Sequence, residues 1–199
     1  MHYVLFEKGA KQLITAFLFS MLGYCILLSP LYFLIRFIII KRTRFHFLRE
    51  LWYYSFFLYC VCIFSQTILP SREFLLGYES AVGRSNFTPF ETIQFYVSRL
   101  GGPMHTVAVY NLVGNIVLFV PFGFYIPSIW HKLQSLWKII IVSFVIPVFI
   151  ETTQYFIGRS IDVDDVILNT IAILIGYSLF HIIQVVKLQS WGRRGNRRV

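Results

Sequence analysis

Charged residues are scarce in this 199-residue chain: Lys, Arg, Asp and Glu together make up 14%, against about 25% in an ordinary soluble domain. Apolar residues make up 57% of the chain, and the mean hydropathy is +0.67. A soluble domain of this length could not bury so much apolar surface, which excludes an ordinary cytosolic enzyme. Intrinsic disorder is excluded for the same reason. The composition indicates a polytopic membrane protein, whose apolar faces are solvated by lipid.

Several common functional motifs are absent as well. Only three cysteines occur, Cys25, Cys60 and Cys62, and all three lie in apolar runs without a nearby His. We interpret them as small buried apolar residues and not as metal ligands or disulfide staples. The sequence contains no Ser or Cys nucleophile with a nearby His and no phosphate-binding glycine loop. It therefore gives no sign of an ATP-driven function and identifies neither a cofactor nor a metal site.

Five apolar runs are long enough to cross a bilayer, since a spanning helix needs about 20 apolar residues. They cover residues 13–40, 51–69, 106–126, 136–157 and 163–186. The predicted fold is all-α: a polytopic membrane helix bundle of about five transmembrane helices. We predict a single integral membrane domain over residues 1–199, in which the N-terminal span precedes a four-helix region, residues 51–186, and a basic tail, residues 187–199.

One long connection, residues 71–105, separates the second and third spans. It contains the stretch Thr88-Pro89-Phe90-Glu91. Proline at the first helical position after a Thr cap is a normal helix start, so this stretch predicts a short interfacial helix. A loop of this length outside a membrane bundle is often functional.

Lys and Arg are distributed unevenly between the two sides of the predicted bundle. The side that holds the chain's C-terminus carries 12 of the 18, and the other side carries 6. By the positive-inside rule, the C-terminus is expected in the cytoplasm and the N-terminus, five spans earlier, outside. The arginines of the basic tail follow a spanning helix directly, so we expect the tail to contact anionic lipid and not nucleic acid.

Polar residues inside the predicted spans are few, and they converge. Each is costly in a membrane and therefore calls for an explanation. Spacings of three, four or seven residues put them on shared helical faces. With a rise of about 1.5 Å per residue, Asn115, Glu151 and Asn169 lie roughly 8–14 Å below the outer ends of their helices. We expect one polar pocket at the outer leaflet, formed by Asn111, Asn115, Glu151, Gln154, Arg159, Asp162, Asp165 and Asn169.

Purely structural roles are the alternative for these residues. Asp162 suits a helix cap, Asn111 and Asn115 suit interhelical hydrogen bonds, and Glu151 suits an ion pair with Arg159. Caps do not explain a carboxylate as deep as Glu151, which favours a functional pocket.

Three stretches resemble the VanZ-like family. The first is NLVGNIVLFVPFGF, residues 111–124; the second begins with Glu151-Thr-Thr-Gln154 and continues through Arg159, Asp162, Asp165, Asn169 and Gly176-Tyr177. The third is Asn86-Phe-Thr-Pro89-Phe90 in the long connection. One departure is Ala172, where the family often has Gly. The resemblance implies a bacterial plasma membrane and an association with low-level resistance to teicoplanin, a lipoglycopeptide; it does not imply a reaction.

Two functions remain open at this point. In the first, the pocket is a binding site at the outer face. Its ligand is a membrane lipid headgroup, a cell-wall precursor or an amphiphilic antibiotic such as a lipoglycopeptide. Alternatively, the protein is an integral membrane enzyme acting on a lipid-linked substrate, with Glu151 as general base and Asp162 and Asp165 as ligands of a divalent cation. A transporter is less well supported, because the inner half of the bundle lacks a polar path.

Overall fold

The computed structural model describes residues 2–40, 46–68, 85–157 and 159–195 of the chain. Within these residues all regular secondary structure is helical, and five helices are long and apolar enough to cross a membrane. These spans are Phe19–Ile39, Phe47–Thr67, His105–Ile129, Leu136–Phe156 and Val163–Val186. The predicted all-α, five-span fold is therefore confirmed, with boundaries close to those expected from hydropathy.

The chain divides into two compact units, residues 1–70 and residues 71–199. We call them the N-terminal hairpin and the C-terminal bundle. The prediction that they form one membrane domain stays a prediction. Residues 69–84 of the long connection and residues 196–199 of the basic tail lie outside the described residues.

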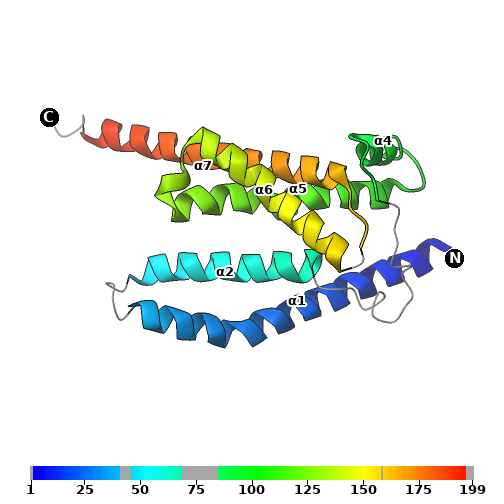
Figure 1. Ribbon diagram of the computed structural model, residues 1–199, viewed down its shortest axis with the longest axis horizontal. Helices are drawn as coiled ribbons and strands as arrows, with labels where there is room; N and C mark the ends of the chain where they lie inside the picture. Colours follow the sequence, from blue (N-terminus) through cyan, green and yellow to red (C-terminus); the bar gives the residue numbers. More distant parts are fainter. Residues whose placement is uncertain (1, 41–45, 69–84, 158, 196–199) are drawn as a thin grey trace. The chain divides into compact units, whose positions relative to one another are not determined.

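The N-terminal hairpin consists of α1, His2–Ile40, and α2, Phe47–Thr67, which pack against each other (Figure 1). Pro30 lies inside α1 without ending it. Two side-chain contacts, which we call rungs, connect the helices. The sulfur atoms of Cys25 and Cys62 lie 3.9 Å apart, and the hydroxyl oxygens of Ser29 and Tyr54 lie 2.8 Å apart. From the first contact to the second, the residue number rises along α1, from 25 to 29, and falls along α2, from 62 to 54, as antiparallel helices require.

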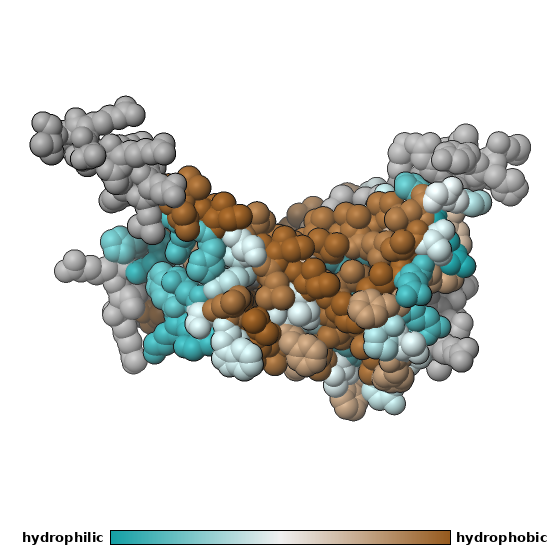
Figure 2. All heavy atoms as spheres, turned by 90° about the horizontal axis from the view of Figure 1, so that it is seen from above, coloured by the Kyte–Doolittle hydropathy of each residue, from teal (hydrophilic) through white to brown (hydrophobic). Residues whose placement is uncertain are grey.

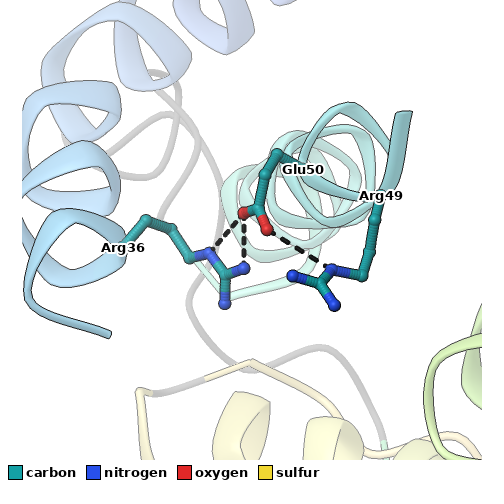
Figure 3. Close-up of polar contacts among 3 residues, drawn as sticks. All are labelled: Arg36, Arg49 and Glu50. Atoms are coloured by element: carbon teal, nitrogen blue, oxygen red, sulfur yellow. Dashed lines mark hydrogen bonds and ion pairs between the residues drawn. The ribbon is translucent and has the colours of Figure 1, made fainter. Parts of the chain in front are cut away.

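The third rung of the hairpin is ionic. Figure 3 shows the carboxylate of Glu50 on α2 between the guanidinium groups of Arg36 on α1 and Arg49. Arg36 Nε donates to Glu50 Oε2 across 2.8 Å, and Nη2 of Arg36 contacts the same oxygen. The Arg36 guanidinium also lies 4.8 Å from the centre of the Tyr53 ring. Arg36, placed inside the first predicted span, is thus charge-paired and stacked.

The C-terminal bundle contains α5, His105–Ile129, α6, Leu136–Phe156, and α7, Val163–Gly195, with the single turn η1, His131–Leu133, between α5 and α6. α7 packs along both α5 and α6 (Figure 1). Its helix continues past the predicted end of the last span, Val186, to Gly195.

Backbone contact fixes the packing of α5 on α7. A Cβ atom on Gly176 would lie 1.9 Å from the carbonyl oxygen of Val120, so only glycine fits this position. Ala172, one turn before Gly176, has no exposed surface and belongs to the same packed face. Small residues allow membrane helices to approach this closely, which strengthens van der Waals packing where lipid supplies no hydrophobic driving force.

Large apolar side chains on the outer faces of the bundle remain exposed, among them Val117, Trp137 and Phe149. In Figure 2, hydrophobic residues occupy the middle of the visible face and hydrophilic residues gather toward its two ends. An exposed apolar surface of this extent suits lipid as the surrounding solvent.

Candidate functional site: a polar cluster where α5 and α7 begin

The segment before α4 is attached to the start of α7. Asn86 and Asp162 form an isolated parallel bridge, in which Asn86 N donates to Ile161 O across 2.8 Å and Val163 N donates to Asn86 O across 3.0 Å. The Asn86 side chain adds a third link, since its Nδ2 donates to Asp162 Oδ1 across 3.1 Å. Two segments separated by 76 residues in sequence are thereby held side by side.

Asp162 also caps α7. Its Oδ1 accepts a hydrogen bond from the backbone N–H of Asp164 across 2.9 Å, which satisfies one of the otherwise unpaired N–H groups of the first turn. Asp162 therefore has the capping role that the structural alternative assigned to it. The same oxygen also accepts from Asn86 Nδ2. Asp162 therefore connects the first turn of α7 to the segment before α4.

Asp164 has no exposed surface, and its carboxylate is hydrogen-bonded to the start of the short helix α4, Glu91–Val97. Its Oδ1 accepts from Phe90 N across 2.5 Å, and its Oδ2 accepts from Ile93 N across 3.0 Å. Two backbone N–H groups at the start of α4 thus bind a carboxylate from another helix, where negative charge is favoured by the helix dipole.

The short helix predicted in the long connection is present, but its predicted start is wrong. The helix begins at Glu91, so Pro89 precedes it and does not occupy the first helical position. Phe90 is the N-cap, in the left-handed conformation with φ of 69°, and its side chain makes no capping bond. A left-handed Phe is strained, and the bond from Phe90 N to Asp164 offsets this strain.

The deeper part of the site joins all three spans of the bundle. Asn115 on α5 donates through Nδ2 to Asp165 Oδ1 on α7 across 2.8 Å. Glu151 on α6 is 4% exposed, and its Oε2 accepts from the backbone N–H of Asp162 across 3.1 Å. Glu151 therefore faces the bundle interior and not lipid.

Two amide oxygens of the predicted pocket are buried without a hydrogen-bond partner. Asn169 is only 3% exposed, and its Oδ1 accepts no hydrogen bond. Asn111 Oδ1 is buried and unpaired as well. Each lies four residues from a member of the hydrogen bond between Asn115 and Asp165, Asn111 before Asn115 and Asn169 after Asp165, and shares its helical face. A buried amide oxygen without a partner costs about 1–3 kcal/mol, so these two atoms call for an explanation.

The remaining two predicted residues, Gln154 and Arg159, lie at the end of α6 and in the turn that follows it. Gln154 is buried, and its backbone carbonyl accepts from the N–H groups of Ile157 and Arg159, which turns the chain after α6. Arg159 is exposed and within electrostatic range of Glu151 and Asp165, both of which it attracts. Asp162 lies within range of the same two carboxylates and repels them.

Tyr96 and Asp164 belong to this region although the pattern of polar residues did not single them out. Burial raises the pKa of Tyr96 above its ordinary value, and the nearby carboxylates of Asp165 and Asp162 raise it further. The Tyr96 phenol is consequently neutral and can donate a hydrogen bond at physiological pH. Its position outside the predicted spans, on a seven-residue helix of the long connection, gave no signal in the sequence.

We define the polar cluster as the predicted pocket residues whose side chains take part in hydrogen bonds between helix ends or carry a buried unpaired amide oxygen. It consists of Asn111, Asn115, Glu151, Asp162, Asp165 and Asn169. That all eight predicted residues face one shared cavity stays a prediction. Among the residues that the structure describes, no group of three or more His, Cys, Asp or Glu side chains is arranged to hold a metal ion.

The fold and the cluster define a class: a multi-pass helical membrane protein with buried carboxylates and amides at one end of its spans. The model of the VanZ/LLP1 family matches residues 56–184 of the chain. The chain belongs to this family, which confirms the resemblance seen in the sequence motifs. Neither the curated proteins nor the solved structures contain a match.

Proposed function

We propose that the polar cluster binds the polar headgroup of a membrane-embedded amphiphile at the outer leaflet. The observation that carries this proposal is Asn169, a 3% exposed amide with an unpaired oxygen one helical turn below the bond between Asn115 and Asp165. A structural amide in a membrane bundle finds a partner on a neighbouring helix. A buried amide oxygen left unpaired on the same helical face as the Asp165 carboxylate suits a site that a ligand completes.

The outer side is part of the proposal and rests on the charge distribution. In the predicted five-span topology, α5 and α7 begin on the side to which the sequence assigns 6 of the 18 Lys and Arg residues. A cluster at that end is accessible from the outer leaflet, where lipids, lipid-linked cell-wall precursors and lipoglycopeptides insert. We further propose that the basic tail, residues 187–199, contacts anionic lipid on the cytoplasmic side.

We further propose that this binding contributes to antibiotic resistance, which the resemblance of the sequence motifs implies. Resistance to teicoplanin-type lipoglycopeptides, implied by the resemblance, follows if the cluster binds the antibiotic itself or the precursor that the antibiotic recognises. Both ligands carry an apolar chain for the lipid phase and a polar group for the cluster.

Glu151→Gln tests this proposal. The Gln side-chain oxygen can still accept from Asp162 N, so the fold is retained, while the negative charge is lost. We expect normal expression and an unchanged or slightly higher melting temperature, because a neutral side chain costs less to bury. Resistance of cells that depend on this protein should be lost.

The matched control is Glu91→Gln, which removes an exposed carboxylate from α4 at the same end of the bundle. This variant should retain resistance. If Glu151→Gln retains full resistance at normal expression, the carboxylate has no functional role and the proposal fails.

The enzyme alternative has no comparable observation behind it. Asp162 Oδ1 already accepts from Asn86 Nδ2 and Asp164 N, and Asp165 Oδ1 accepts from Asn115. These bonds give both aspartates structural roles, which account for their positions without a shared metal ligand.

A further inference from the structure

Hydrogen-bond acceptors outnumber donors in the polar cluster. Ionised Glu151, Asp162 and Asp165 carry acceptor oxygens only. Asn115 Nδ2 reaches one oxygen of Asp165, and the N–H of Asp162 reaches one oxygen of Glu151. The buried Oδ1 atoms of Asn111 and Asn169 add two further acceptors that no donor reaches.

Negative charge in the cluster is only partly balanced. The carboxylates of Glu151, Asp162 and Asp165 lie within electrostatic range of one another. Arg159 attracts Glu151 and Asp165, but its side chain is exposed and its charge is therefore screened by water. In a medium of low dielectric constant, an ionised carboxylate is costly unless it takes up a proton or pairs with a cation, and a cation that enters the cluster relieves this cost.

A phosphate does not suit such a site. Its oxygens are acceptors, so they would meet carboxylates and amide oxygens of the same character. An ammonium group suits it, because it carries one positive charge and three N–H donors. It would bond the carboxylates of Glu151 and Asp165 and the unpaired oxygen of Asn169 without displacing the bonds already formed.

We propose that the ligand of the polar cluster carries a primary ammonium group, which donates hydrogen bonds to its carboxylates and to the unpaired amide oxygen of Asn169. This inference rests on the proposed function and names the chemical class of its ligand. The ammonium belongs either to a lipid headgroup or to a soluble amine, and the experiment separates these sources.

The experiment measures the melting temperature of the purified full chain in detergent micelles with added lipids of identical acyl chains. Phosphatidylethanolamine should raise the melting temperature by about 3 °C or more at saturation. Phosphatidylcholine, whose ammonium has no N–H donor, and phosphatidylglycerol, which has no amine, should leave it unchanged. Free ethanolamine and Mg²⁺ are added alone in two further arms.

Variants connect the shift to the cluster. Asn169→Ala and Glu151→Gln should each weaken phosphatidylethanolamine binding by about tenfold or more, since a hydrogen bond to the ammonium or an ion pair with it is lost. Two positions are used so that poor folding of one variant leaves the other as a test. Glu91→Gln is the control and should bind like the unchanged protein.

The outcomes separate this inference from the proposed function. A shift from free ethanolamine equal to that from the lipid supports the ammonium and assigns it to a soluble amine. An equal or larger shift from phosphatidylglycerol or from Mg²⁺ alone overturns the ammonium inference, whereas a resistance defect in Glu151→Gln would still support binding at the cluster. No shift in any arm overturns the inference, and full resistance of Glu151→Gln would overturn the proposed function independently.

Discussion

A Cβ atom on Gly123 of α5 would lie 1.8 Å from the carbonyl oxygen of Ile173 on α7. The two backbones therefore touch at this point. Gly123 and Ile173 are 50 residues apart, as are Asn115 and Asp165 (173 − 123 and 165 − 115), whose side chains form a hydrogen bond two turns nearer the start of the helices. The glycine contact thus fixes the register that brings Asn115 to Asp165.

Gly123→Ala should separate α5 from α7. The added methyl group meets backbone atoms of Ile173 and Tyr177, which cannot rotate away as a side chain would. We expect a loss of about 2 kcal/mol or more in the free energy of unfolding, although alanine has the higher helix propensity. Thermal unfolding in detergent measures this loss.

Gly114→Ala is the matched control for this substitution. It lies on the same helix, and a Cβ atom there has nothing within 4 Å. Its melting temperature should stay the same or rise slightly through helix propensity. Equal stability of the two variants would contradict the close packing at Gly123.

Asp164→Ala should release α4 from the bundle. The substitution removes the acceptor of Phe90 N and Ile93 N and leaves the strain at Phe90 unopposed. We expect a destabilisation of about 1–3 kcal/mol, confined largely to this segment. Hydrogen exchange should become faster at Phe90 and Ile93, while Glu91→Gln leaves it unchanged. Unchanged protection of Ile93 in Asp164→Ala would argue against the carboxylate cap.

Hydropathy alone located the spans within a few residues, because the bilayer demands about 20 apolar residues wherever a helix crosses it. It also identified Glu151 and Asn169 as buried polar residues, since any polar residue inside such a run stands out. Both are buried in the structure. This part of the fold follows from local composition.

The contacts between distant segments could not be read in the same way. Asp164 lies between Asp162 and Asp165 in the sequence, and its partners Phe90 and Ile93 lie 74 and 71 residues away. Helical periodicity places side chains on faces, but it does not say which loop returns to a helix start. Tyr96 was missed for the same reason, because it reaches the cluster only after Asp164 has positioned α4.

The ion pair of Arg36 with Glu50 should stabilise the N-terminal hairpin. Both side chains are largely shielded, with 18% and 13% of their surface exposed. Arg36→Gln should cost about 1–2 kcal/mol, because Glu50 loses its closer partner. Exchange of the two charges, Arg36→Glu with Glu50→Arg, should recover part of this loss in a double-mutant cycle.

Arg49→Gln is the control for this pair. Arg49 is 40% exposed, and its Nε lies 3.5 Å from Glu50 Oε1, so its removal should cost less than about 0.5 kcal/mol. A larger loss from Arg49→Gln than from Arg36→Gln would show that Glu50 depends on its exposed neighbour, contrary to the geometry in Figure 3.

The orientation proposed for the cluster makes the basic tail cytoplasmic. A cysteine placed at Arg197, in a background with Cys25, Cys60 and Cys62 replaced by serine, should resist an impermeant thiol reagent in intact cells. A cysteine placed at the exposed Gln94 of α4 should react. Labelling at position 197 in intact cells would reverse the topology and place the cluster on the cytoplasmic side.

The pairing of α1 with α2 predicts a specific cross-link between Cys25 and Cys62. Their sulfur atoms lie 3.9 Å apart, and a disulfide needs about 2 Å, a difference that small side-chain rotations can close. Both thiols lie inside predicted spans, so an oxidant that partitions into lipid, such as molecular iodine, should form the bond and an impermeant one should not. Cys60 precedes Cys62 by two residues, or about 200° of helix rotation, and therefore points elsewhere.

Mass spectrometry of the oxidised protein should detect one peptide pair joined through Cys25 and Cys62. Cys60→Ser should leave this cross-link intact, whereas Cys62→Ser should abolish it. A cross-link between Cys25 and Cys60 in the unchanged protein would require α2 to be rotated by roughly half a turn. The same rotation would move Tyr54 away from Ser29 and Glu50 away from Arg36, so this result would contradict all three rungs of the hairpin together.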